Sequence, residues 1–123
     1  MARNTTRQGA NFELKVMHDL EEHDYMCFRS SGSRGAIDVG AVHRAPLYGG
    51  GKSFLAIQCK LTNPVISPAE RLAVQDWALC AEATPLVAHW AKDAKTGLMR
   101  VHYRLLTGPG HKDWAHWAPG EDD

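Results

Sequence analysis

The run SFLAIQCKL, residues 53–61, places the strongest constraint on the fold of this chain. Its apolar and β-branched residues predict a buried strand, which Asn63-Pro64 ends. Alternation along a strand places Gln58 and Lys60 on one face and Cys59 on the other. An amide and an ammonium group side by side on one face of a sheet need a chemical reason, so we expect partners for them elsewhere in the chain.

Hydrophobic periodicity in the rest of the chain predicts two helices and four more strands. The helices are expected at residues 8–23 and, after a Ser67 cap with Pro68 at the first position, from there to about residue 82. The strands are expected at residues 25–29, 37–42, 53–61, 85–91 and 98–106. Residues 37–61 are expected to form a hairpin, and the second helix a crossover. This order, α-β-β-β-α-β-β, predicts an α/β fold with a mixed sheet of about five strands flanked by helices.

The length and the composition of the chain indicate its domain organisation. The chain has 123 residues, which suits a single domain with one core. We expect this domain to span residues 1–106. Residues 107–123 contain three Gly, two Pro and two Trp, and they predict an irregular tail.

Composition also restricts the class of protein. The 14 Lys and Arg residues balance 14 Asp and Glu residues, which argues mildly against a nucleic-acid binder, although one face can still be cationic. The three cysteines are odd in number and form no CxxC or CxxH pair, so neither a disulfide framework nor a zinc site is expected. No run approaches the ~20 apolar residues of a membrane span, and the opening MARNTTRQGANFE has no apolar signal-peptide core. We therefore expect a cytoplasmic location.

Polar residues that break the apolar pattern form a candidate catalytic cluster. Pairing of the second and third strands brings Asp38 near Gln58, and the first helix carries Glu13 beside its apolar stripe. Mg²⁺ prefers oxygen ligands, which Asp38, Gln58, Glu13 and the main-chain carbonyl of Cys59 can supply. Lys60 can lower the pKa of a bound water or neutralise charge on a phosphate. This set of groups suits the hydrolysis of phosphodiesters.

The same residues resemble the PD-(D/E)XK nuclease superfamily, because Asp38 is followed, after 19 residues, by Gln58-Cys59-Lys60. The surrounding sequence is similar to the archaeal-type Holliday junction resolvases, which are also found in phages. In that family a helix with a catalytic Glu leads to a strand ending in an Arg-Ser-x-Gly-Ser turn, then to Asp and a hairpin that reaches Glu-x-Lys. The turn here is Arg29-Ser30-Ser31-Gly32-Ser33. The resemblance covers residues 7–106, including the strand PLVAHW.

The resemblance implies a restriction-endonuclease-like fold and an activity. The chain would be a Mg²⁺-dependent endonuclease that resolves four-way DNA junctions as a homodimer, with Mn²⁺ able to replace Mg²⁺, inside a cell or encoded by a phage. Glu13, Asp38 and Lys60 match the family's catalytic and metal-binding residues, and Ser33 matches a serine near the scissile phosphate. Gln58 stands where the family usually has glutamate, which keeps an oxygen ligand but removes one negative charge.

Contacts to DNA are expected from the residues that flank this cluster in the sequence. They are Arg3, Arg7, Arg29, Ser30 and Arg34. Guanidinium and hydroxyl groups of this kind bind backbone phosphates and carry little base specificity. Junction recognition would then depend on the shape of the DNA backbone.

Simpler interpretations of the same residues stay open. Glu13 can be a solvated helix residue, Asp38 can cap a turn, and Gln58 and Lys60 can mark a strand that emerges into solvent. Three other functions are compatible with the sequence. They are a nicking or restriction-like endonuclease acting on ordinary duplex, a junction-binding module weakened in catalysis by Gln58, and an adaptor with no role in nucleic-acid chemistry.

Overall fold

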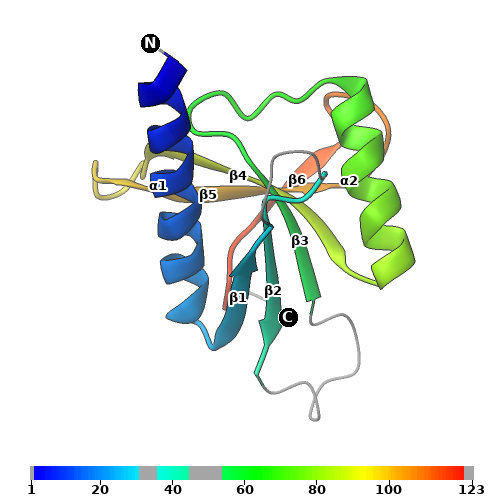
Figure 1. The fold of residues 1–123 in the computed structure, drawn as a ribbon, viewed down its shortest axis with the longest axis horizontal. Coiled ribbons are helices and arrows are strands. Elements are labelled where there is room, and N and C mark those ends of the chain that lie inside the picture. The colour runs from blue at the N-terminus through cyan, green and yellow to red at the C-terminus, as the bar shows by residue number, and fades with distance from the viewer. Residues whose placement is uncertain (1, 31–35, 45–53, 121–123) are drawn as a thin grey trace.

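The computed structural model describes residues 2–30, 36–44 and 54–120, and side chains only from residue 8 onward. Two helices and six strands follow one another along these residues (Figure 1). The helices are α1 (Ala2–Glu21) and α2 (Pro68–Ala81). The strands are β1 (Tyr25–Arg29), β2 (Val39–His43), β3 (Phe54–Cys59), β4 (Thr84–Lys92), β5 (Met99–Leu106) and β6 (Trp114–Trp117).

The six strands form one open sheet in sequence order, β1-β2-β3-β4-β5-β6. β2 and β3 pair antiparallel, as expected of the predicted hairpin. β3 and β4 run parallel, and α2 makes the crossover between them. The remaining neighbours are antiparallel, so the predicted mixed sheet is confirmed.

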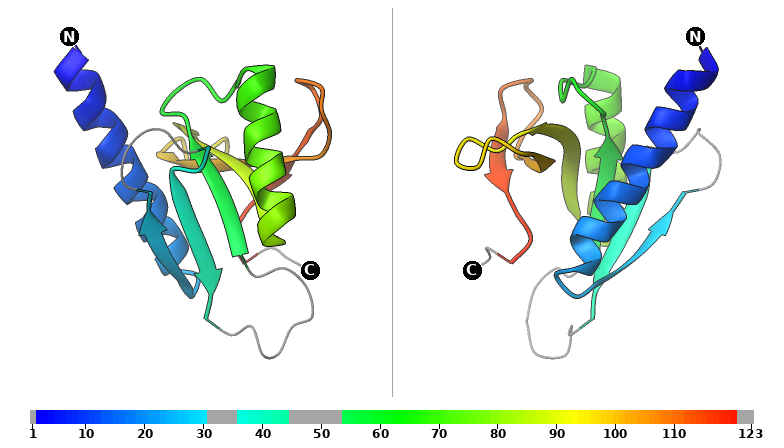
Figure 2. Two further views of the ribbon diagram at one scale, coloured as in Figure 1. Left: turned by 45° about the vertical axis from the view of Figure 1, so that its right-hand side comes forward. Right: turned by 90° about the vertical axis from the view of Figure 1, so that its left-hand side faces the viewer.

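The two helices pack on opposite faces of the sheet, as the two views in Figure 2 show. α1 contributes Phe12, Val16 and Leu20 to a core that includes Leu55 and Ile57 of β3. α2 contributes Val74 and Ala78 to a second core with Ala56 and Val87. The alternation of β3 between these cores follows from the two-residue period of a strand, and it fixes which side chains can face α2.

α2 begins at a capping box and holds the C-terminal segment. The Ser67 hydroxyl accepts a hydrogen bond from the backbone N–H of Glu70 at 3.1 Å, and the Glu70 carboxylate accepts one from the backbone N–H of Ser67 at 3.0 Å. Arg71 is buried and donates to the carbonyls of Gly108 and Asp113 at 2.9 and 3.0 Å. These bonds fix the loop that leads from β5 into β6.

Two expectations from the sequence were wrong. The tail over residues 107–123 is not irregular throughout, because residues 114–117 form β6 and pair with β5, which raises the strand count from about five to six. The first helix begins at Ala2 rather than at residue 8. The prediction relied on an apolar stripe, and the polar segment before residue 8 has none although it is helical. No helix among the described residues is long and apolar enough to cross a membrane.

Candidate active site

Asp38 lies at the point where β2 and β3 meet. Its backbone N–H donates to the carbonyl of Ile57 at 2.8 Å, and its carboxylate accepts the N–H of Cys59 at 2.8 Å. The hairpin pairing therefore brings Asp38 to the end of β3, as the sequence predicted. Burial raises the pKa of Asp38, and the Cys59 N–H and the charge of Lys60 only partly offset this effect.

Lys60 follows β3 and turns toward α2. Its ammonium lies 2.9 Å from the Glu70 carboxylate, and its side chain is 29% exposed. The backbone N–H of Ser67 and the Lys60 ammonium both lower the pKa of Glu70. Lys60 is thus a cation held at one end by its strand and at the other by the first turn of α2.

Glu13 reaches the same region from α1, on the other face of the sheet. Its carboxylate lies 3.1 Å from Nε of Arg29, the last residue of β1. Burial raises the pKa of Glu13, and the negative charge of Asp38 raises it further against the opposing effect of Arg29. The two carboxylates are therefore close enough to repel one another, which a cation between them would relieve.

Gln58 and Cys59 occupy the last two positions of β3. Gln58 follows Ala56 by two residues and so shares the α2 face with Lys60, and its side chain makes no hydrogen bond to any residue in the described part of the chain. The Cys59 side chain packs against the α1 core instead. Burial raises the pKa of the Cys59 thiol well above its usual value, and Asp38 adds to the shift. Because this side chain packs into the α1 core, the group that Cys59 offers beside Gln58 and Asp38 is its main-chain carbonyl.

The donor set fits a hard divalent cation better than a soft one. Over residues 2–30, 36–44 and 54–120, no group of three or more His, Cys, Asp or Glu side chains is placed to hold a metal ion. A site here would use one or both carboxylates, Asp38 and Glu13, with the neutral oxygens of Gln58 and Cys59. This is the ligand pattern of Mg²⁺, which keeps several waters and needs few protein ligands.

Of the five residues expected to contact DNA, the structure describes the side chains of Arg29 and Ser30. Arg29 is paired with Glu13, and its side chain is 42% exposed, so it retains free guanidinium surface. Ser30 is half-buried and donates its backbone N–H to the carbonyl of Asp38 at 3.0 Å, which holds the start of the turn against β2. Ser33 and Arg34 lie outside the described residues. Arg3 and Arg7 fall within α1, in the part whose side chains are not described.

Glu70 is a residue at the site that sequence reasoning missed. From the sequence, the segment Ser67-Pro68-Ala69-Glu70 predicts only the start of a helix. One carboxylate oxygen of Glu70 completes the capping box, and the other binds Lys60. The capping-box pattern, Ser followed three residues later by Glu, was the available signal for the first role. The second role depends on where α2 lies relative to β3, which spacing alone does not give.

No protein-family model matches the chain, and no curated protein is significantly similar to it. The resemblance to the resolvases therefore stays a prediction from the motif residues of the sequence.

Proposed function

We propose that this protein is a metal-dependent endonuclease that cleaves phosphodiesters at four-way DNA junctions. One observation carries the proposal. Asp38 and Lys60, 22 positions apart in the chain, lie at the end of one hairpin, where the carboxylate of Asp38 accepts the N–H of Cys59. The charge of Lys60 acts on Asp38, and the charge of Asp38 acts on Glu13. Two desolvated carboxylates beside a fixed ammonium group suit a cation and a phosphate together.

Each residue has a role that follows from its surroundings. Asp38, with Gln58, the Cys59 carbonyl and Glu13, would hold a divalent ion, which when bound supplies a water of lowered pKa and a positive charge beside the phosphate. Lys60 would neutralise charge that develops on the phosphate oxygens. Its bond to Glu70 orients the ammonium in advance, and such preorganisation lowers the cost of stabilising the transition state.

A homodimer would place two such sites against two DNA strands, because symmetric cuts need symmetric subunits. Recognition would depend on backbone phosphates more than on bases. The formal net charge of zero limits the number of phosphates that the protein neutralises. We therefore expect junction binding that survives only at modest salt concentrations.

The test is a cleavage assay on a labelled synthetic four-way junction, beside a linear duplex of the same sequence. We expect paired nicks in the junction with Mg²⁺ or Mn²⁺ and none with EDTA. Equal cleavage of the linear duplex would instead indicate a nicking or restriction-like enzyme. Absence of both cleavage and junction binding would reject the proposal.

Two substitutions test whether these residues act in catalysis and not in folding. Asp38→Asn and Lys60→Ala should each reduce the cleavage rate on the order of a hundredfold to a thousandfold, with circular dichroism unchanged. Asp93→Asn and Lys92→Ala are the matched controls, since they remove the same charges from the distant β4–β5 hairpin. Wild-type rates in Asp38→Asn or Lys60→Ala would rule out this site.

A second candidate is a junction-binding module with weak catalysis. Gln58 favours it, because an amide in place of a carboxylate leaves fewer negative charges to bind a divalent ion. In this case the junction shifts in a gel but stays intact with Mg²⁺ and Mn²⁺. Recovery of cleavage by Gln58→Glu would assign the defect to that residue.

A further inference from the structure

The α2 face of the sheet carries a row of basic and imidazole side chains beyond the candidate active site. Its members, named here the histidine–arginine face, are His89 on β4, His102 and Arg104 on β5, and His116 on β6. His89 pairs with His102 across the strands, and Arg104 pairs with His116. Since cross-strand partners and residues two apart share a face, all four side chains lie on one side of the sheet.

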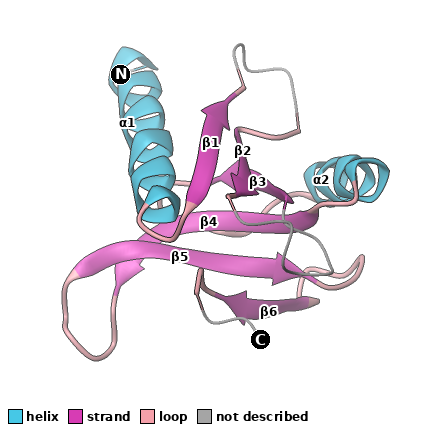
Figure 3. Cartoon of the chain, turned by 90° about the horizontal axis from the view of Figure 1, so that it is seen from below, coloured by secondary structure: helices cyan, strands magenta, loops and turns pink. Residues whose placement is uncertain are grey.

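This face begins beside Lys60. β3 and β4 are parallel with Cys59 opposite Ala88, so one residue further along Lys60 lies beside His89. The backbone N–H of Lys60 donates to the carbonyl of Ala88 at 2.9 Å, which fixes this register. β4, β5 and β6 follow β3 in this order across the sheet (Figure 3). The histidine–arginine face on these strands therefore continues the candidate active site.

Neither helix closes this part of the sheet. α1 lies on the opposite face, and α2 packs mainly on β3 and β4. His89, His102 and Arg104 are half-buried, and His116 is exposed. The His89 and His102 rings stack with centroids 5.4 Å apart, so each imidazole restricts the orientation of the other while both stay partly exposed.

Arg104 is fixed in place without a counter-ion among the described residues. Its guanidinium carbon lies 3.9 Å from the centroid of the Trp114 ring, a cation–π contact that orients the group. Its Nε is buried and has no hydrogen-bond partner in the described part of the chain. Burial lowers the pKa of Arg104, and the positive charge of Arg71 lowers it further, so the neighbouring charge is repulsive.

The electrostatics of His89 agree with a surface that lacks an anion. Burial lowers the pKa of His89 to about 4, with further lowering from Arg104, His102 and His116. At neutral pH His89 is thus an uncharged imidazole that can donate or accept a hydrogen bond, while Arg104 and Lys60 carry the positive charge. A bound anion would relieve the repulsion.

We propose that the histidine–arginine face binds the phosphate backbone of a duplex DNA arm that leaves the candidate active site. This inference rests on the proposed function. Two observations select this ligand. The face carries the guanidinium of Arg104, which has no acidic partner among the described residues, beside imidazoles that can donate hydrogen bonds to phosphate oxygens. The face is also continuous with Lys60, where the scissile phosphate would lie. A metal ion does not suit it, since no three of the described His, Cys, Asp or Glu side chains are placed to hold one.

The experiment measures junction binding by fluorescence anisotropy in EDTA, so that cleavage plays no part. Arg104→Gln should weaken binding about threefold to tenfold and reduce the slope of log affinity against log salt by about 1, as expected for one lost phosphate contact. His116→Glu places a carboxylate on the exposed end of the face without disturbing buried groups, and it should weaken binding by a similar factor.

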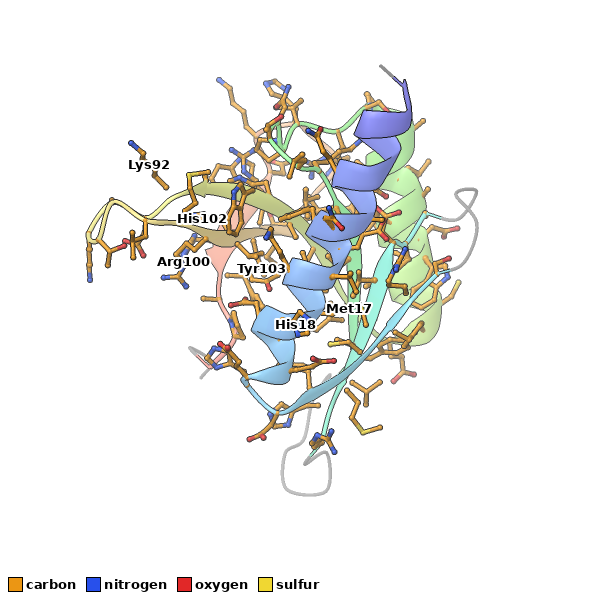
Figure 4. The ribbon with its side chains drawn as sticks, turned by 60° about the vertical axis from the view of Figure 1, so that its left-hand side comes forward. Met17, His18, Lys92, Arg100, His102 and Tyr103 are labelled. Atoms are coloured by element: carbon orange, nitrogen blue, oxygen red, sulfur yellow. The ribbon has the colours of Figure 1, made fainter. Side chains whose placement is uncertain are left out.

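Lys92→Gln is the matched control. It changes the charge by the same single unit, and Lys92 leaves the β4–β5 hairpin on the opposite side from Arg100, which shares a face with His102 (Figure 4). Binding by this control should equal that of the parent protein. Unchanged affinity and salt slope in both Arg104→Gln and His116→Glu would overturn the proposed face while leaving the nuclease proposal intact. Failure of the parent protein to bind the junction would overturn both.

Discussion

The two faces of the sheet differ in what covers them and in what they carry. On the α1 face, large apolar side chains from β2, β3, β4 and β5 pack against Phe12, Val16 and Leu20, and they are almost completely buried. On the α2 face, apolar packing ends where α2 ends, and the strand positions beyond it are occupied by Lys60 and the histidine–arginine face. A sheet covered by a helix serves stability, whereas the uncovered remainder of the same sheet is free to carry charge.

The comparison predicts that the buried apolar residues of the α1 face control folding and not chemistry. The substitution with the largest expected effect tests this point. Leu55→Ala should lower the free energy of unfolding by about 2–5 kcal/mol, because Leu55 is fully buried and its loss leaves a cavity. Leu72→Ala, on an exposed position of α2, should change it by less than about 0.5 kcal/mol. Chemical denaturation measures both values. A comparable cost at the two positions would contradict the division between the faces.

The α2 face is expected to control metal affinity. Gln58→Glu should bind Mg²⁺ about tenfold more tightly, since one added charge beside a divalent ion contributes on the order of 1 kcal/mol or more even when screened. Cleavage should be equal or faster. Isothermal titration with Mg²⁺ gives the affinity, and a synthetic junction gives the rate. An inactive Gln58→Glu protein that binds Mg²⁺ normally would mean that the amide donates a hydrogen bond that the reaction needs.

Acidification should inactivate the site before it affects the α1 core. The pKa of Asp38 is raised, so its carboxylate takes up a proton at a higher pH than an ordinary aspartate as the pH falls. Because the charged form is needed to hold a cation, cleavage should decline through that pH range while circular dichroism stays constant. Rates measured across a pH series at a fixed Mg²⁺ concentration below saturation test this expectation. A profile that stays flat down to the usual range of aspartate would count against it.

Glu70→Gln should shift the same pH profile, and we expect this effect to be smaller. The charge of Glu70 contributes to the raised pKa of Asp38, so its removal should move the acid limb of the profile to lower pH. The substitution keeps an oxygen that can accept the Ser67 N–H, so stability should fall by less than about 1 kcal/mol. Asp76→Asn, an exposed substitution on α2, is the control and should leave the profile unchanged. A shift to higher pH in Glu70→Gln would mean that the loss of order at Lys60 outweighs the loss of charge.

Local sequence patterns determined most of the elements of this fold. The apolar run ending in Gln58 and Lys60, the helical spacing of Phe12 and Val16, and Pro68 after Ser67 each specify structure through neighbours a few residues away. The pairing of β2 with β3 followed because consecutive strands usually lie next to each other in a sheet. That pairing was enough to predict that Asp38 lies at the end of β3.

The contacts between distant elements were decided only by the tertiary structure. The sequence around Lys60 does not predict that Glu70 is its partner. The Gly and Pro residues of the tail likewise do not predict that residues 114–117 add a strand beside β5. Both depend on packing: α2 is placed by the apolar residues it buries against β3 and β4, and Arg71 then fixes the loop before β6. The hydrophobic effect that places α2 on the sheet is non-directional. The polar pairs that form across this packing therefore cannot be predicted from the spacing of residues in the sequence.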